Sequence, residues 1–380
     1  MKQRIDIIIP DVVLAENAAK AERLRRTQSF EPTDRVPVVI NTNQWWALAA
    51  RGSDYAAYTR SPRDNLVGQI LNAKYRLEHV RDDRPVPTKR LGFSPDFGCL
   101  RGVEFEMEVE WTAGEAPKCR HPLERVEDID RLGVPPPDGG LNRKRIAWYR
   151  EMQAAAEQLD VRLNGEPLEL AVTLGQPGGP IPSAFALAGS NLFLWMAMDP
   201  ERVHRLMRIV TQSHIEATRF FDEMMGRDPV HPLGMGCDAA EMIGPDMYRE
   251  FVLPYYLQVW EQYSGPRGLH MCGRIDHLLG ILRDELEITA LNGFGFPTDR
   301  HVLAEQMAGR VVLKGGPHPG LIKDGPVSAI VKECLSYIET VGRAGGFVLQ
   351  LGGGSAVGTP AAHFEAMRQA SERACVGAVA

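Results

Sequence analysis

The alternation of short apolar runs with longer amphipathic stretches is the feature that most constrains how this chain folds. Near-continuously apolar strands separated by helices are typical of a parallel sheet covered by helices. A further β-like run, "RVPVVIN", lies near the start of the chain at 35–41. From about residue 168 onward the β-rich runs occupy residues 168–175, 231–236, 268–272, 288–295, 310–316 and 346–354.

The number of these runs predicts a (β/α)8 barrel rather than an open doubly wound sheet. No glycine-rich phosphate-binding fingerprint follows an early strand, which further weakens the dinucleotide-binding alternative. We predict one barrel domain over residues 1–380, with an N-terminal extension of helices and a β-hairpin over about residues 1–160. In a barrel the C-terminal ends of all strands meet at one mouth. We therefore expect the polar residues that end these runs to converge there, namely Asp238, Cys272, Asn292 and His318.

Composition and charge exclude several classes of function. The formal net charge is −6 and the sequence pI is about 6.0, and no basic run is present, which argues against nucleic-acid binding. The longest apolar stretches, such as residues 190–198, are far shorter than the roughly 20 residues that cross a bilayer. Asp6 and Asp11 interrupt the apolar start, so it does not resemble a signal peptide. We predict a cytoplasmic protein without nucleic-acid or membrane partners.

The segment "RGLHMCGRIDHLL" at 267–279 carries a possible metal site. His270 and Cys272 are two residues apart at the end of an apolar run, so in an extended strand their side chains point to the same side. Imidazole nitrogen and thiolate sulfur both bind zinc, and catalytic zinc usually keeps three protein ligands and one open position. The alternative is a packed cysteine beside a hydrogen-bonded histidine.

Two strand-to-helix loops add candidates for the same site. The loop before Pro245 holds Cys237, Asp238 and Glu241, where a barrel places active-site groups. The alternative role for the two acids is electrostatic stabilisation of the following helix N-terminus. His318 lies just past another strand, between two prolines that stiffen its loop.

The segment "NQWW" at 43–46 is a candidate substrate contact. Trp46 offers an aromatic wall for a planar substrate, and Asn43 offers a polar group beside it. A buried aromatic cluster is the alternative explanation for the two tryptophans.

Several segments together resemble the uroporphyrinogen decarboxylase superfamily, and the resemblance extends from about residue 34 to residue 372. It rests on "DRVPV", "DPERVHRLM", "GPDMYREFVLPYY", "LHMCG", "GRVVLKGGPHP" and "GGGSAVGTP", which occur in the family's order. The resemblance implies a (β/α)8 barrel with its site at the C-terminal mouth. It also implies one of two activities. One branch decarboxylates the acetate side chains of uroporphyrinogen without a cofactor, and the other comprises zinc-dependent methyltransferases that serve small substrates, thiols and corrinoid proteins.

"LHMCG" resembles the methyltransferase branch, in which the H-x-C pair binds zinc, and this implies that His270 and Cys272 are ligands. The family's usual third ligand is a cysteine, and in "LGGGSAVGTP" Gly353 stands at that position. We expect Glu241 to supply the third ligand instead. The alternatives are Cys237, Asp238 and His318; the last stands where the family commonly has an aspartate.

The resulting prediction is a zinc-dependent methyltransferase. It would move a methyl group between a small O-methyl or N-methyl substrate and a thiol or a corrinoid carried by a partner protein. The predicted catalytic residues are Asp238, Glu241 and His318, and the predicted substrate contacts are Asn43, Trp46 and Asn292. The alternative is a cofactor-free decarboxylase or lyase that acts on a small aromatic or carboxylic acid, whose carboxylate Arg274 could bind. A porphyrinogen with eight carboxylates is disfavoured, because Arg51 is the only basic residue in the corresponding N-terminal loop.

Overall fold

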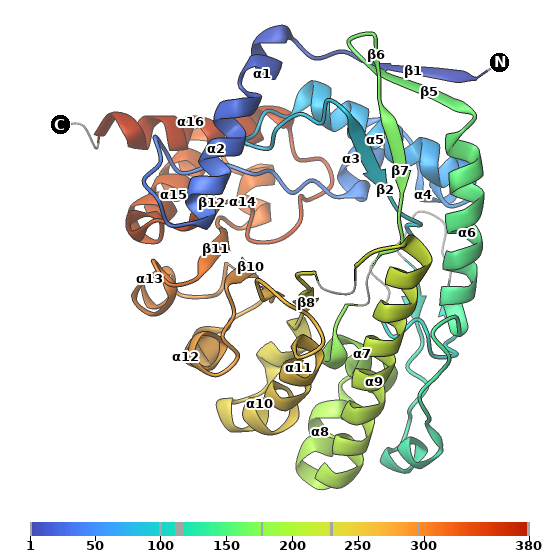
Figure 1. Cartoon of the computed structure of the whole chain (residues 1–380). Helices are drawn as coiled ribbons and strands as arrows, with labels where there is room; N and C mark the ends of the chain where they lie inside the picture. The colour runs from blue at the N-terminus through green and yellow to red at the C-terminus, as the bar shows by residue number, and fades with distance from the viewer. Residues whose placement is uncertain are drawn as a thin grey trace.

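The computed structural model describes residues 2–98, 101–110, 117–175, 178–228, 231–294 and 296–377. A small sheet lies outside the barrel at the N-terminal end of the chain (Figure 1). Its strands are β1 (Gln3–Ile7), β5 (Leu159–Leu163) and β6 (Glu166–Pro167). β1 pairs in parallel with β5, and β5 forms an antiparallel hairpin with β6. The buried side chains of this sheet pack in a cluster of their own with α5 (Pro62–His79), apart from the main core.

The larger part of the molecule is a (β/α)8 barrel, as the sequence predicts. Its continuous sheet has the strand order β12-β11-β10-β9-β8, and all of its pairs are parallel. These strands are β8 (Gly234–Gly236), β9 (Gly268–His270), β10 (Ala290–Phe294), β11 (Val312–Gly315) and β12 (Phe347–Leu349). Val38 continues the sheet through a parallel bridge to Leu349. β2 (Arg90–Phe93) and β7 (Glu169–Val172) form the remaining parallel pair.

Two carboxylates take the place of a strand partner for the first barrel segment. Asp83 Oδ2 accepts the Val38 N–H at 2.7 Å, and Asp82 Oδ2 accepts the Ile40 N–H at 3.0 Å. Both acids are buried, and Arg35 donates to Asp83 while Arg84 donates to Asp82. Buried backbone donors need partners, and these two carboxylates supply them for residues 38–40.

Helix α9 (Pro200–Met225) begins and ends as its sequence predicts. Asp199 is the N-cap, and its side chain accepts the Arg202 N–H, while Pro200 occupies the first helical position. Gly226 ends the helix in the left-handed conformation, with φ +61°. The helix buries one long apolar face against the barrel.

The remaining elements surround these strands. In the N-terminal part they are α1 (Asp11–Ala15), α2 (Asn17–Gln28), α3 (Gln44–Ala50), α4 (Tyr55–Tyr58), β3 (Val109–Glu110), β4 (Lys118–Cys119), η1 (Val126–Arg131) and α6 (Gly140–Ala156). Around the barrel they are α7 (Pro180–Ala188), α8 (Asn191–Met198), η2 (Asp238–Met242), α10 (Pro245–Phe251), α11 (Leu253–Trp260), η3 (Asp276–Leu278), α12 (Leu279–Asp284), α13 (Arg300–Met307), α14 (Pro319–Asp324), α15 (Val327–Thr340), η4 (Gly342–Ala344) and α16 (Ala361–Gly377). Among the described residues, no single helix is both long and apolar enough to cross a bilayer, and only α7 and α8 taken together, bent by 99°, meet that test.

The strand register sorts the barrel side chains into two rows. Leu269, Leu291 and Leu313 are aligned on β9, β10 and β11, and all three join the core formed with the surrounding helices. Neighbouring residues on a strand point to opposite faces. The next aligned row, made of His270, Asn292 and Lys314, therefore faces the barrel interior.

Candidate metal centre

Three side chains from two adjacent strand ends form a compact cluster at the mouth. Cys272 Sγ lies 3.3 Å from His270 Nε2, and Asp238 Oδ1 lies 3.5 Å from the same nitrogen. The three ligand atoms are all within 4.8 Å of one another. One nitrogen, one sulfur and one oxygen donor match the ligands that zinc takes, and three ligands leave the open position of a catalytic site. The residues present therefore fit a zinc ion.

Asp238 reaches the cluster because η2 begins directly after β8. Its Oδ1 also accepts the backbone N–H of Cys272 at 2.9 Å, so the carboxylate fixes the turn that carries the thiol. The sequence favoured Glu241 as the third ligand, with Asp238 as an alternative. The structure places the Asp238 carboxylate, and not that of Glu241, beside His270 and Cys272.

Glu241 supports the turn after Cys272. Its Oε2 accepts the Arg274 N–H at 2.9 Å and lies so close to Gly273 that a Cβ there would stand 1.3 Å from it. Gly273 has φ +89°, which glycine adopts without strain. Gly293 makes similar room for His270, since a Cβ on Gly293 would stand 2.5 Å from the imidazole Cε1. Two glycines thus let the backbone pass close to the cluster.

The electrostatics of the cluster favour a bound cation. Burial raises the pKa of the Cys272 thiol to about 12, and Asp238 and then Glu241 act in the same direction, because nearby negative charge disfavours a thiolate. A divalent cation reverses this balance by offsetting the carboxylates and stabilising the thiolate.

Cys237 lies outside the cluster although it precedes Asp238. Its side chain is buried, and its sulfur lies 3.7 Å from the Tyr248 hydroxyl in the helical layer. Burial raises the pKa of this thiol to about 12. Cys237 is therefore a packed residue, which leaves Asp238 as the third donor.

His318 and Gly353 follow β11 and β12, and neither belongs to the cluster of Asp238, His270 and Cys272. His318 is exposed and is the N-cap of α14, where its Nδ1 accepts the Gly320 N–H at 2.8 Å. Its ring meets the edge of Phe296 at a centroid distance of 3.9 Å. The carbonyl of Gly353 accepts a hydrogen bond from Asn41 Nδ2, and a Cβ at Gly353 would meet only Pro319 Cγ, at 3.3 Å.

The two predicted contacts in "NQWW" serve the fold. Asn43 is the N-cap of α3: its Oδ1 accepts the Trp46 N–H, and its Nδ2 donates to the Ser355 carbonyl. Trp46 is 1% exposed, and its Nε1 donates to the Thr359 carbonyl. This burial corrects the prediction that Trp46 forms an open aromatic wall, because the indole packs against Tyr75 and Phe364 and leaves no free face.

Asn292 lies where the sequence predicts, and the structure adds a residue that sequence reasoning missed. Asn292 is aligned with His270 on the neighbouring strand and is exposed toward the mouth. Lys314 is aligned with Asn292 on the next strand, and burial lowers the pKa of its ammonium group. The signal for Lys314 was present, because a lysine inside the otherwise apolar run "RVVLKGG" must face either the core or a polar interior.

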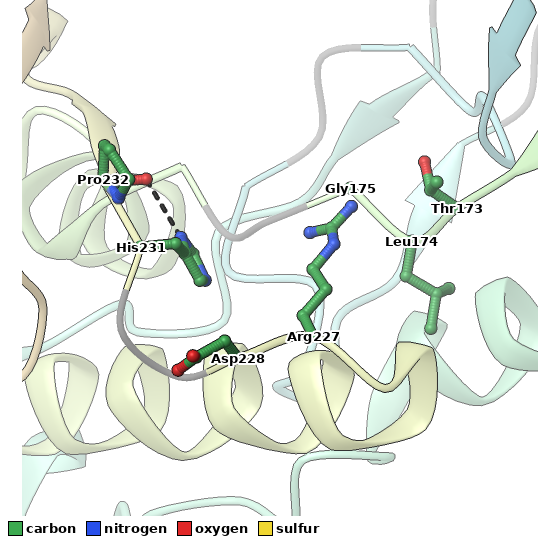
Figure 2. A pocket seen from close by; sticks show the side chains of 7 residues that line it. All are labelled: Thr173, Leu174, Gly175, Arg227, Asp228, His231 and Pro232. Atoms are coloured by element: carbon green, nitrogen blue, oxygen red, sulfur yellow. Dashed lines mark hydrogen bonds between the residues drawn. The ribbon is translucent and has the colours of Figure 1, made fainter. Parts of the chain in front are cut away.

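A separate cavity of about 570 Å³ lies between the segment that follows β7 and the connection from α9 to β8 (Figure 2). It is lined by Thr173, Leu174, Gly175, Arg227, Asp228, His231 and Pro232. None of these lining residues belongs to the cluster of Asp238, His270 and Cys272.

Comparisons with known proteins place the chain among its relatives. Residues 101–374 match the family model described as uroporphyrinogen decarboxylase (URO-D). The uroporphyrinogen decarboxylase of Xanthomonas campestris pv. campestris (strain B100) is 26% identical over 366 residues, which cover 88% of this chain and 93% of that protein. The uroporphyrinogen decarboxylase of Paraburkholderia xenovorans (strain LB400) is 23% identical over 359 residues, with coverages of 88% and 89%.

The solved structure of a methyltransferase from Methanosarcina mazei shares the fold. Its TM-score is 0.63 at 17% sequence identity, and the match covers 93% of this chain and 98% of that chain. The family model spans most of the present sequence, including both strand ends that carry the cluster. The chain belongs to the uroporphyrinogen decarboxylase family.

Proposed function

We propose that this chain is a zinc-dependent methyltransferase, which moves a methyl group between a small O-methyl or N-methyl substrate and a corrinoid protein or a thiol. The observation that carries the proposal is the cluster of Asp238, His270 and Cys272, with donor atoms within 4.8 Å of one another at the mouth. Membership of an enzyme family and the shared fold with a methyltransferase support it.

The ligand atoms would be His270 Nε2, Cys272 Sγ and Asp238 Oδ1. When bound, zinc supplies Lewis-acid chemistry, which stabilises a thiolate or polarises the heteroatom that carries the methyl group. One thiolate and one carboxylate offset the charge of a divalent ion, so the loaded site is neutral. Such a site binds a neutral substrate heteroatom without a charge penalty.

Two residues of the chain keep this geometry. Asp238 holds the Cys272 backbone N–H as well as donating a ligand oxygen, so ligand and turn are fixed together. Glu241 holds the next turn through the Arg274 N–H. Rigid support of this kind keeps catalytic groups within reach of a productive geometry.

His318 is the proposed hydrogen-bond donor of the mouth. Because its Nδ1 accepts the Gly320 N–H, the neutral imidazole carries its proton on Nε2. Nε2–H can then donate to a substrate atom held in the mouth. Asn292, beside His270, is the proposed polar contact to the substrate.

The proposed macromolecular partner is a corrinoid protein. Met242, Phe296 and Val357 follow β8, β10 and β12, and all three are exposed large hydrophobic residues at the mouth end of the barrel. Exposed apolar side chains grouped around a site are typical of a surface that another protein covers. A methyl carrier would approach the cluster from this side.

The test is methyl transfer by the zinc-loaded protein. We would incubate it with methoxylated aromatics and methylamines and follow methylation of free cob(I)alamin by absorbance, and of a thiol by mass spectrometry. We expect transfer from at least one donor, and none with Cys272→Ser at equal protein concentration. Absence of transfer from every donor, or equal transfer by Cys272→Ser, would contradict the proposal.

A cofactor-free decarboxylase is the second candidate, and the uroporphyrinogen decarboxylases at 23–26% identity favour it. Two local contacts weigh against a polycarboxylate substrate. Arg51 donates from Nε and Nη2 to Asn72 Oδ1, and Arg274 donates to Asp276, so each guanidinium is engaged within the fold. Carbon dioxide release that withstands a chelator and is unchanged in Cys272→Ser would favour this candidate over methyl transfer.

A further inference from the structure

Lys314 is a charged residue in the barrel interior that the proposed chemistry does not use. It lies in the middle of β11, flanked by Leu313, which packs into the main core, and by Gly315. Because neighbouring residues on a strand point to opposite faces, the lysine side chain points away from that core and into the barrel. A lysine is rarely placed on an interior face unless its charge meets a partner there.

The register sets Lys314 in the same layer as the cluster. Lys314 is aligned with Asn292 of β10, and Asn292 is aligned with His270 of β9. Neighbouring strands lie about 4.8 Å apart, so two strand spacings put the Lys314 Cα roughly 10 Å from the His270 Cα. A one-ring molecule can bridge that interval, with one end at the cluster and the other at the ammonium group.

The lysine charge has no counter-ion within the described part of the chain. No carboxylate there lies within ion-pair distance of its Nζ, and burial alone lowers the pKa of the group. The next strand offers Val348 in register with it, which is buried and apolar. Holding a half-buried cation without a partner is unfavourable, and an anionic ligand would remove that cost.

We propose that Lys314 binds the anionic end of the substrate, and that the substrate class is a small methylated carboxylate. This inference rests on the proposed methyl transfer for the reaction, but the carboxylate site itself is testable without turnover. The carboxylate pairs with the Lys314 ammonium, Asn292 contacts the middle of the molecule, and the methyl-bearing heteroatom points to Asp238, His270 and Cys272. Lys314 thus determines specificity by charge, two strands away from the cluster.

The test compares acids with their neutral amides. The probes are acetate, benzoate and 4-methoxybenzoate, each paired with its amide, and affinity is measured by titration calorimetry. The variants are Lys314→Met and, as the matched control, Lys332→Met, an exposed lysine of α15. Melting temperature and zinc content are recorded for every preparation.

We expect at least one acid to bind the wild-type protein about tenfold more tightly than its amide, as a charge-assisted hydrogen bond allows. This preference should vanish in Lys314→Met and persist in Lys332→Met. Equal binding of acids and amides, no acid binding below about 10 mM, or a preference that survives Lys314→Met would overturn the inference.

A second measurement covers the case in which Lys314→Met does not fold. In the wild-type protein, the acid probe should slow acylation of Lys314 by acetic anhydride, read by peptide mapping, while its amide should not. Equal protection by both probes would also overturn the inference. If the protein binds zinc but does not prefer the acids to their amides, only this inference is contradicted. If it prefers the acids but binds no zinc, only the proposed metal chemistry is contradicted.

Discussion

A histidine–aspartate pair lies near each end of β8, yet the two pairs differ in what surrounds them. In the segment that precedes β8, His231 Nε2 lies 2.9 Å from Asp222 Oδ2. His231 Nδ1 lies 3.0 Å from the Pro232 carbonyl, as Figure 2 shows. Their side chains are 22% and 3% exposed. Both ring nitrogens are engaged, so this pair joins the α9–β8 connection to the helix.

At the mouth, His270 and Asp238 are 3.5 Å apart, and their side chains are 44% and 47% exposed. A thiol lies 3.3 Å from the same imidazole nitrogen. A histidine–aspartate pair alone does not indicate a ligand site. The third donor and the greater exposure distinguish the mouth pair and support its proposed role as a metal site. This matches the general rule that barrels keep function at the C-terminal ends of strands and stability at the other end.

The largest predicted effect is the difference in stability between alanine substitutions at two glycines with positive φ. Gly273 lies beside the cluster, and Gly226 lies at the end of α9. Gly273→Ala should destabilise the protein by about 3 kcal/mol and weaken metal binding, because φ +89° strains an alanine and its Cβ would displace the Glu241 carboxylate from the Arg274 N–H. Gly226→Ala should cost only about 1 kcal/mol and spare the metal, because nothing lies within 4 Å of that Cβ. Denaturant unfolding and elemental analysis measure both. Equal and small losses of stability in both variants, with metal binding retained, would contradict this prediction.

The second prediction compares asparagine substitutions at the two aspartates, Asp238 and Asp222. Asp238→Asn should weaken zinc binding at least about 100-fold while leaving the stability of the metal-free protein within about 0.5 kcal/mol. Asp222→Asn should leave zinc affinity intact but cost about 2 kcal/mol, because the buried carboxylate holds His231 and Arg227. Competition with a chromophoric chelator and denaturant unfolding measure the two quantities. Loss of metal in Asp222→Asn would show that the two ends are not independent.

The smallest predicted effect is a pH dependence at the end opposite the mouth. The Pro232 carbonyl and then Asp222 raise the pKa of His231 above its ordinary value of 6.5. A raised pKa means that the folded state binds the proton more tightly. Protonated His231 therefore contributes about 1 kcal/mol to the free energy of unfolding, the value of a charged hydrogen bond. This contribution is complete below pH 6.5 and is lost as the pH rises through the folded-state pKa of His231. Unfolding of the metal-free protein between pH 5.5 and 9 should show this decline, and His231→Gln should flatten it. An unchanged slope in His231→Gln would refute this assignment.

The sequence predicts the barrel because most of its strands can be recognised as β-rich runs. Six β-rich runs and the run at 35–41 coincide with β7 to β12 and with the Val38 bridge. The eighth parallel segment, β2, was missed because "RLGF" is only four residues long and carries a glycine and an arginine. The period-two alternation of residues 104–111 is typical of a strand, yet among the described residues there only Val109–Glu110 forms one. Glu104 is instead buried, and its carboxylate accepts a hydrogen bond from Ser213. Period-two alternation does not reveal such tertiary contacts.

The candidate site was predictable in type but not in detail. Spacing alone brought His270 and Cys272 to one side of a strand, because extended chain has a fixed period of two residues. The choice between Asp238 and Glu241 as third donor depended on the 3-10 helix η2, which holds both residues. There the Asp238 carboxylate accepts the Cys272 N–H, whereas the Glu241 carboxylate accepts the Arg274 N–H. Sequence cannot fix such a turn. The same holds for Trp46, whose burial depends on Tyr75 and Phe364, from helices on either side of it in the fold.

The most direct test of the account is the metal content of the purified protein, measured by elemental analysis for the wild type and Cys272→Ser. The cluster predicts about one zinc per chain in the wild type and its loss in the variant, with an unchanged melting temperature for the metal-free proteins. No zinc in the zinc-supplemented wild type, or equal zinc in both proteins, would contradict the assignment of Asp238, His270 and Cys272 as a metal centre.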